Sequence, residues 1–194
     1  NTRSRGLGDV YKRQNYATHM VTLNVKDNSY LEFIPEQIIP YKKSRFYQKT
    51  NLVIDDSSTV VYSETIVPGR IAMGEMFDFD VCFLKTEGKI NDRIQFRDSS
   101  LLSPKTQKIE SLAMFDDKTI LTSVYILTKK HLTKIKDMID ELFSHTQNIT
   151  GGSSILPNDS GISIRILGNS SEDQKTTIYE IIKIIRKEIL PDYL

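Results

Sequence analysis

The 194-residue sequence lacks features that would define its class at once. It contains one cysteine, Cys82, so it cannot form an internal disulfide, and a disulfide scaffold is excluded. It contains no run of about 18 apolar residues, the length that a transmembrane helix requires. A lone cysteine suits a reducing compartment. We therefore expect a cytoplasmic protein without a membrane partner.

Charge and metal-binding residues are also sparse. The formal net charge is +1, which creates no long-range field, so we expect no nucleic-acid partner. The histidines His19, His131 and His145 are far apart and show no HxH or HExxH spacing. The sequence thus predicts no tight preformed metal site, and weak handling of an ion by carboxylates stays open.

Short apolar runs with period-two alternation dominate the first half of the chain, which is typical of β-strands. A hairpin is expected where 20–25 and 30–34 flank the turn at 27–29. A second is expected where 77–84 and 90–96 flank residues 86–89. We predict an antiparallel β-body over 15–98, of sandwich, barrel or stacked-sheet type, with strands at 20–25, 30–34, 47–54, 59–67, 77–84 and 90–96.

The pattern changes after about Ser99, and residues 99–194 combine strands with two helices. Apolar residues at helical spacing predict one helix over about 129–145 and a last helix that begins near Ser171 and ends before Pro191. Ser171 and Gln174 resemble a capping box. Strands are expected at 108–114, 119–127 and 162–167, with residues 150–153 as a loop. The fold class is therefore mostly β (α+β), in one domain over 15–194.

Residues 1–14 differ from the rest in origin. Ser4–Gln14 resembles the in-frame translation of a sequencing-library adapter. We interpret 1–14 as a non-native tail, so the native sequence is expected to begin near Asn15.

Two acidic residues are predicted to face inward. Alternation along 60–66 and 90–96 places Glu64 and Asp92 on the apolar faces of their strands. A buried, unpaired carboxylate costs several kcal/mol, so each needs a partner, a water path or an ion. Two interpretations stay open: buried ion pairs with Arg70 or Arg93, or a polar passage through the β-body along which a cation moves.

Catalysis has weaker support. Ser63 and Ser99 have no histidine nearby in the sequence, so no triad is indicated. Glu64 and Glu75 together pose the alternative of a carbohydrate-active or other hydrolytic β-protein. Tryptophan, which usually builds sugar platforms, is absent, so this alternative ranks second.

One charged corner lies between two of the predicted strands. Pro68 fixes φ and Gly69 accepts positive φ, so the chain leaves the first strand sharply. Gly74 permits a second bend before the next strand. The segment combines these residues with charge and an aromatic side chain: Pro68, Gly69, Arg70, Gly74, Glu75 and Phe77.

This corner, with Glu64 upstream, resembles the GR…GE.F signature of the UreD (UreH) family of urease accessory proteins. Residues 31–40, LEFIPEQIIP, resemble the family's "LE.LP…I.P" segment, and Asp92-Arg93-Ile94 resembles the acid-Arg-apolar run that follows. The resemblance extends from about Met20 to the C-terminus. From this resemblance we expect the family's N-terminal third to be missing from this sequence.

The resemblance implies stacked β-sheets with two helices towards the C-terminus. It implies a non-enzymatic chaperone that binds apo-urease and UreF, and UreG through UreF, and helps nickel reach the urease active site. An internal polar tunnel is the route that the resemblance implies. Carried over by position, Glu64 and Asp92 become candidates for the nickel path, and Arg70 becomes their counter-charge. The remaining signature residues, with Arg93, are expected to shape the corner. No tightly bound cofactor is implied, only transient Ni²⁺.

Overall fold

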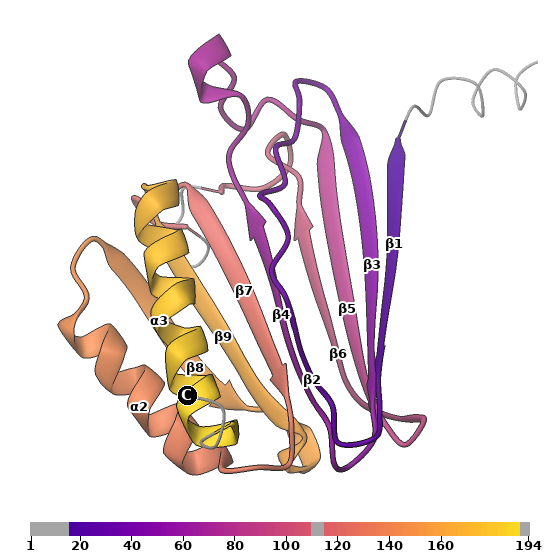
Figure 1. Ribbon diagram of the computed structural model, residues 1–194. Helices are drawn as coiled ribbons and strands as arrows, with labels where there is room; N and C mark the ends of the chain where they lie inside the picture. The colour runs from indigo at the N-terminus through magenta and orange to yellow at the C-terminus, as the bar shows by residue number, and fades with distance from the viewer. Residues whose placement is uncertain (1–15, 110–114, 191–194) are drawn as a thin grey trace, which may run out of the picture.

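The computed structural model describes residues 16–109 and 115–190, which form two β-sheets and two α-helices (Figure 1). The first sheet has the strand order β1 (Ala17–Val25), β3 (Arg45–Ile54), β5 (Val81–Ile90), β6 (Arg93–Leu102). The second has the order β2 (Tyr30–Phe33), β4 (Thr59–Ile66), β7 (Ile120–Leu127), β9 (Gly161–Gly168), β8 (Ile149–Ile155). Helices α2 (Leu132–His145) and α3 (Ser171–Ile189) cover the outer face of the second sheet. The mostly-β class with two C-terminal helices is confirmed.

The first part of the chain alternates between the two sheets. After β1 the chain turns into β2 of the other sheet, then returns as β3, and it repeats this exchange through β4 and β5. Each return brings a strand back in the same direction, so β1, β3 and β5 pair in parallel, as do β2 and β4. The expected hairpin of β1 and β2 is therefore wrong, and the sheets are mixed rather than wholly antiparallel.

The turns that pass the chain between sheets stack on one another. Asp27 and Asn28 adopt positive φ, which these residue types tolerate better than most. The Asp27 amide donates to the Asp55 carboxylate (2.8 Å), and the Asn28 amide donates to the Ser57 hydroxyl (2.9 Å). The Asn91 side chain donates to Asp56 (2.6 Å) from the β5–β6 turn. These side chains hold the three turns in register.

Three apolar clusters form the core. One lies between the second sheet and the helices and includes Ile135, Ile139, Ile164 and Ile181. The other two include residues of both sheets, one around Leu52, Tyr62 and Phe96, the other around Ile66, Cys82 and Phe115. Strand β4 is buried along its whole length because one face meets the first sheet and the other meets the helical layer.

Both predicted helices are present, with one correction at a cap. Helix α3 is capped by Ser170, whose hydroxyl accepts from the Asp173 amide (3.2 Å), so the predicted Ser171–Gln174 capping box lies one residue too far along. The expected strands at 119–127 and 162–167 correspond to β7 and β9. The loop expected at 150–153 is wrong, because these residues lie within β8; the pair Gly151 and Gly152, which sequence patterns assign to turns, occupies an edge strand.

Other predicted strand and turn boundaries differ from those of the structure. The predicted turn at 86–89 lies inside β5, and the chain turns instead at Asn91 and Asp92, both at positive φ. The division expected after Asp98 falls inside β6, and the strands that follow complete the second sheet. Most of the strand expected at 108–114, and the whole tail at 1–14, lie outside the described residues.

Candidate functional site

Glu64 is the least exposed carboxylate among the described residues. It lies on β4 with Tyr62 and Ile66 on the face towards the first sheet, as the sequence pattern predicted. Only 3% of Glu64 is exposed. Its neighbours Tyr62 and Ile66 belong to two different apolar clusters. A carboxyl group therefore interrupts the apolar core between the sheets.

A chain of hydrogen bonds links Glu64 to the edge of the first sheet. The Tyr62 hydroxyl donates to Glu64 Oε2 (3.0 Å) and accepts from Gln48 Nε2 (2.9 Å) and Thr50 Oγ1 (3.1 Å). Gln48 Nε2 also approaches Glu64 Oε2 (3.3 Å). Gln48 Oε1 in turn accepts from Nδ1 of His19, which is exposed on edge strand β1. This chain of hydrogen bonds thus leads from the exposed His19 to the buried carboxylate of Glu64.

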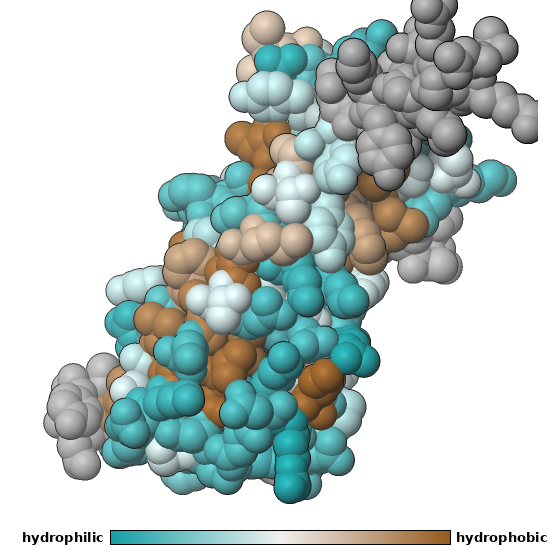
Figure 2. Space-filling model, turned by 90° about the vertical axis from the view of Figure 1, so that its right-hand side faces the viewer, coloured by the Kyte–Doolittle hydropathy of each residue, from teal (hydrophilic) through white to brown (hydrophobic). Residues whose placement is uncertain are grey.

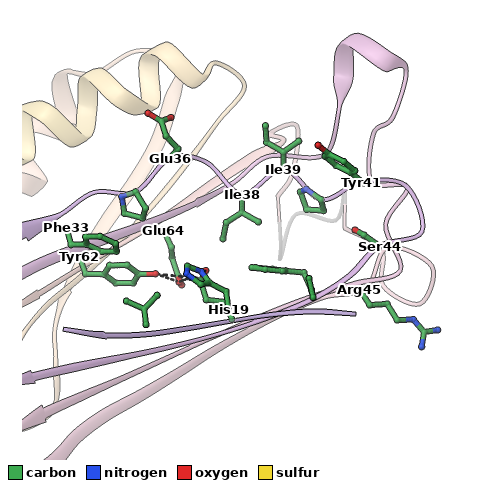
Figure 3. A pocket seen from close by; sticks show the side chains of 16 residues that line it. His19, Phe33, Glu36, Ile38, Ile39, Tyr41, Ser44, Arg45, Tyr62 and Glu64 are labelled. Carbon is green, nitrogen blue, oxygen red and sulfur yellow. Dashed lines mark hydrogen bonds between the residues drawn. The ribbon is translucent and has the colours of Figure 1, made fainter. Parts of the chain in front are cut away.

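A cleft of about 440 Å³ lies between the two sheets, next to β1, and is lined by His19, Gln48, Tyr62 and Glu64 among others (Figure 3). Figure 3 shows His19, Tyr62 and Glu64 together on one side of the cleft, and Ile38 and Phe33 among its apolar walls. The segment 35–41, which leaves β2, closes the opposite side. The cleft therefore combines apolar walls with a polar path that ends on a carboxylate.

Burial dominates the electrostatics of the cleft. Loss of hydration raises the pKa of Glu64, and the hydrogen bond from Tyr62, the charge of Arg165 and the hydrogen bond from Gln48 oppose this rise in part. Burial and the neighbouring Glu64 also raise the pKa of Tyr62 well above its ordinary value. Tyr62 therefore remains a hydroxyl donor, and Glu64 holds its proton more tightly than an exposed glutamate does.

A second polar group lies on the other side of Glu64. Arg165 of β9 forms an ion pair with Asp98 of β6, and this pair joins the two sheets. The Tyr125 hydroxyl donates to Asp98 (3.0 Å) and accepts from Arg165 (3.2 Å). Both charged groups act on the pKa of Glu64, Arg165 downward and Asp98 upward. The polar band thus continues beyond Glu64 towards β6, the other edge of the first sheet.

Asp92 does not join this site. It lies in the β5–β6 turn with φ of 63°, and it is exposed. In the register of the sheet, this turn follows the pair Ile54–Ile90, whereas the cleft lies near the opposite end, where Arg45 pairs with Val81. The prediction that Asp92 faces inward is wrong because β5 runs on to Ile90 and places Asp92 at a turn. Arg93 is exposed as well.

The signature residues form a closed loop instead of a lining for the cleft. Gly69 takes φ of 138°, as the sequence predicted, and Gly74 takes φ of 73° at the second bend. A single 3₁₀ turn, η1 (Ile71–Met73), lies between them. The Phe77 amide donates to the Pro68 carbonyl (2.7 Å) and ties the two ends together. Residues 68–77 are called the signature loop below.

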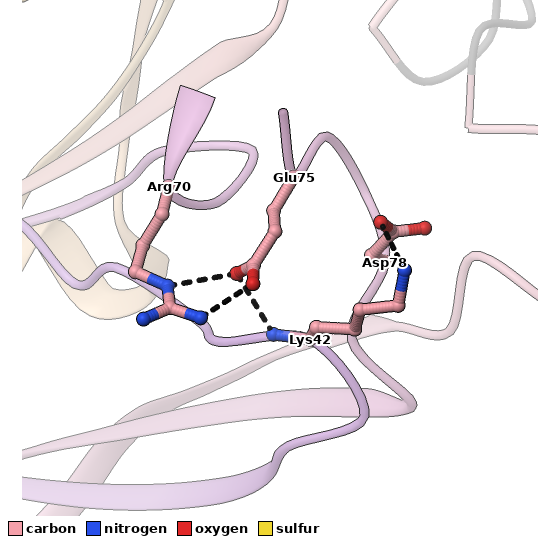
Figure 4. A network of polar contacts seen from close by, with 4 residues as sticks. All are labelled: Lys42, Arg70, Glu75 and Asp78. Atoms are coloured by element: carbon pink, nitrogen blue, oxygen red, sulfur yellow. Dashed lines mark hydrogen bonds and ion pairs between the residues drawn. The ribbon is translucent and has the colours of Figure 1, made fainter. Parts of the chain in front are cut away.

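Arg70 is the counter-charge of Glu75, not of Glu64 or Asp92 (Figure 4). Both oxygens of Glu75 accept from the Arg70 guanidinium, with Nε at 2.9 Å from Oε2, and the Lys42 amide donates to Oε2 (3.1 Å). These donors lower the pKa of Glu75, first through the Arg70 hydrogen bond. Because Glu75 is held in this way and does not line the cleft, the structure does not pair it with Glu64.

Metal-binding residues are dispersed. Among residues 16–109 and 115–190 no group of three or more His, Cys, Asp or Glu side chains could hold a metal ion. Cys82 is fully buried, and burial together with the nearby Glu64 raises the pKa of its thiol to about 12. Within the same ranges, no helix is long and apolar enough to cross a bilayer.

Sequence reasoning found Glu64 but missed most of its surroundings. His19, Gln48 and Thr50 come from strands of the first sheet, whose pairing with one another is parallel and long-range. Tyr62 carried a signal, because it lies two residues from Glu64 on the same strand face. Arg165 and Asp98 meet only because β9 and β6 lie in facing sheets, and no local pattern announces that contact.

The described part is a mostly-β protein in which a polar path, set in a cleft with apolar walls, ends on a buried carboxylate. Comparison with known proteins identifies its family. The family model for the UreD urease accessory protein matches residues 3–192. The chain belongs to the UreD family of urease accessory proteins.

Individual relatives agree. The chain is 32% identical to the urease accessory protein UreD of Cenarchaeum symbiosum over an aligned region of 172 residues, and this region covers 87% of this chain and 60% of that protein. It is 32% identical over 179 residues to the urease accessory protein UreD 2 of Brucella canis, and the alignment covers 90% of this chain and 59% of that protein. It is 32% identical over 187 residues to UreD of Yersinia enterocolitica, with 91% and 57% covered. The chain thus spans about 60% of the length of these relatives.

Proposed function

We propose that this protein acts in urease maturation by binding apo-urease and UreF, and UreG through UreF, and that it helps to deliver nickel to the urease active site. Family membership supports the accessory role. The partners and the cargo follow from the resemblance of the signature loop and its flanks. The protein works as a cytoplasmic chaperone and not as an enzyme.

The observation that carries the nickel proposal is the placement of Glu64. A carboxylate that is 3% exposed between two apolar clusters costs stability, so the fold retains it at an energetic disadvantage. Burial raises its pKa, so a cation that binds there has to displace a proton. Imidazole nitrogen and carboxylate oxygen both suit Ni²⁺, and His19 and Glu64 supply them along one cleft.

A transient path fits this cleft better than a storage site. A delivery protein must release its cargo, which requires few ligands at any one point. The ligands here are spread along the cleft, with His19 exposed at the edge strand and Glu64 buried. Nickel is thus cargo, bound weakly and passed on.

The geometry favours this function over hydrolysis. A glycosidase needs two carboxyl groups that face one bond of the substrate. Glu64 faces the cleft, whereas Glu75 is occupied by Arg70 and the Lys42 amide in the signature loop. The two glutamates do not share a cavity, so the structure gives the hydrolytic alternative no support.

Co-purification tests the proposed function. The chain is expressed with a tag in cells that contain the urease genes, UreF and UreG but lack their own UreD, and its complexes are isolated and identified. We expect apo-urease subunits and UreF in the complex, and restored urease activity in the cells. A protein that folds, binds neither partner and restores no activity would overturn the proposal.

A further inference from the structure

His19 lies at the outer end of the hydrogen-bond chain that leads to Glu64. It is exposed on β1, the edge strand of the first sheet, whereas Glu64 is only 3% exposed. Figure 1 shows β1 as the outermost strand, and Figure 2 shows the molecule from that side, where patches of hydrophobic side chains lie among hydrophilic ones. Both residues line the same cleft. A cation that enters at this edge therefore meets His19 before Glu64.

The orientation of the Gln48 amide is fixed by its inner partners. The Tyr62 hydroxyl gives its single proton to Glu64 Oε2 (3.0 Å), so towards Gln48 it can only accept. The atom of Gln48 that faces Tyr62 is therefore the donor Nε2, which also approaches Glu64 Oε2 (3.3 Å). The carbonyl oxygen Oε1 is left for the other side, where His19 lies.

The Gln48 carbonyl determines which ring nitrogen of His19 carries the proton. The distance between His19 Nδ1 and Gln48 Oε1 is 2.9 Å. Because an amide oxygen can only accept, Nδ1 has to donate and therefore carries the proton. A neutral imidazole has one N–H, so the other nitrogen, Nε2, keeps its lone pair. Gln48 thus holds His19 as the Nδ1–H tautomer, with Nε2 as the atom that can bind a metal.

Histidine residues that bind metals are held in this way. The ring donates its second N–H to an oxygen acceptor, which fixes the tautomer and orients the ring. Glu64 alone would discriminate poorly, because carboxylates suit Mg²⁺ and Ca²⁺, whereas imidazole nitrogen suits nickel, copper and zinc. A histidine placed before the carboxylate can therefore separate these two groups of cations.

We propose that His19 Nε2 is the entrance ligand of the cleft, that it selects Ni²⁺ over Mg²⁺ and Ca²⁺, and that Gln48 is the positioning residue that holds it in the binding tautomer. His19 contacts the cation, and Gln48 acts only through His19. A single imidazole binds weakly, which suits a cation that is passed on. The inference rests on the proposed function for the identity of the cargo.

Nitrogen-15 NMR of the imidazole rings tests the tautomer. The chain is labelled at its histidines, and spectra are recorded at pH 8 without metal. We expect His19 to be mainly Nδ1–H, and Gln48→Met, which removes Oε1 but nearly keeps the side-chain volume, should shift it to the Nε2–H form that predominates in free histidine. His145, exposed at the end of α2, is the internal reference for that form. A wild-type His19 that is mainly Nε2–H would overturn the inference.

Nickel chloride is then titrated into the same samples, and the loss of each histidine signal is followed, because Ni²⁺ is paramagnetic. Gln48→Met should lower the affinity at His19 about tenfold or more, as the loss of a metal ligand's hydrogen-bond partner does elsewhere. An excess of Mg²⁺ of about a hundredfold should not compete. Gln95→Met, the same change on β6 outside the cleft, is the matched control. Unchanged nickel affinity in folded Gln48→Met, or competition by Mg²⁺, would refute the proposal.

Folding is checked by urea denaturation, because Gln48 is 4% exposed. His19→Ala changes an exposed residue, so it should fold as the wild type does, and it should abolish the nickel response of the other residues that line the cleft. If Gln48→Met does not fold, the wild-type tautomer and His19→Ala decide the question.

The outcomes separate the two proposals. The tautomer and the nickel affinity are measured on the chain alone, whereas the proposed function is tested by co-purification with urease and UreF. A chain that binds neither partner but shows the expected tautomer and selectivity would refute only the proposed function. A chain that binds its partners and restores urease activity, but whose His19 is mainly Nε2–H, would refute only this inference.

Discussion

The hydroxyl of Tyr62 offers a sharp test of the polar network. Tyr62→Phe removes one oxygen, which donates to Glu64 and accepts from Gln48 and Thr50. The ring keeps its place in the apolar cluster, and Tyr62 is 1% exposed, so water does not readily replace the lost partner. The change therefore isolates the hydrogen bonds from the packing.

The expected cost follows from those three bonds. A buried hydrogen bond contributes about 0.5–1.5 kcal/mol net, and one to a charged group about 1.5–3 kcal/mol. Because Gln48 keeps its contact with Glu64, the loss is smaller than the full sum, and we expect about 2–3 kcal/mol. With a urea m-value of about 2–3 kcal/mol/M, the midpoint of unfolding falls by about 1 M.

Urea denaturation followed by circular dichroism measures this loss. Tyr47→Phe is the matched control, because Tyr47 is half-buried and its ring packs beside Phe83 outside the network, and it should change stability by less than about 0.5 kcal/mol. A double-mutant cycle with Glu64→Gln should reveal a coupling of about 1 kcal/mol or more. A loss below about 0.5 kcal/mol for Tyr62→Phe, without coupling, would refute the network.

Three further predictions concern stability. The pKa of Glu64 is raised in the folded state, so the stability that this group contributes is greatest below its unfolded pKa and falls as pH rises through its folded pKa. Glu64→Gln should remove this fall and raise the urea midpoint of unfolding at pH 8 relative to the wild type. An unchanged pH profile of stability would contradict the raised pKa of Glu64. Ile139→Ala, in the fully buried face of α2, should cost about 2–5 kcal/mol in urea unfolding, and a cost below about 1 kcal/mol would contradict the assigned packing. Gly161→Ala should cost about 3 kcal/mol or more by the same measurement, because φ is 154° and a Cβ would meet the Ile126 carbonyl oxygen at 2.0 Å. Near-wild-type stability of this variant would contradict the close contact between Gly161 and the Ile126 carbonyl.

The sequence predicted those parts of the fold that depend on local pattern. The periodicity of α2 and α3 is set by neighbours along the chain, and so is the alternation that turns Glu64 inward. The positive φ of Gly69 and the bend at Gly74 followed from residue type alone. These features could be predicted because the apolar face of a helix, the inward face of a strand and a glycine in a turn each reflect interactions within a few residues.

Long-range pairing was not predictable in the same way. The turn at Asp27 and Asn28 looks like a hairpin turn, yet the chain changes sheet there, and only the parallel partner β3 reveals it. Asp92 was misplaced by a similar ambiguity, since apolar alternation continues through β5 and does not mark where the strand ends. The sequence offers two glutamates, Glu64 and Glu75, as partners for Arg70. In the structure Arg70 pairs with Glu75, which lies five residues away in the same loop.

The central claim is that Glu64 carries nickel towards urease, and nickel content tests it most directly. Urease is matured in cells that lack their own UreD and that express the wild-type chain, Glu64→Gln or Asp92→Asn, and nickel per purified urease is measured by mass spectrometry. We expect Glu64→Gln to co-purify with urease as the wild type does but to lower nickel occupancy at least tenfold. Asp92→Asn, at the exposed β5–β6 turn, should leave occupancy unchanged. Full nickel occupancy with Glu64→Gln would contradict the account.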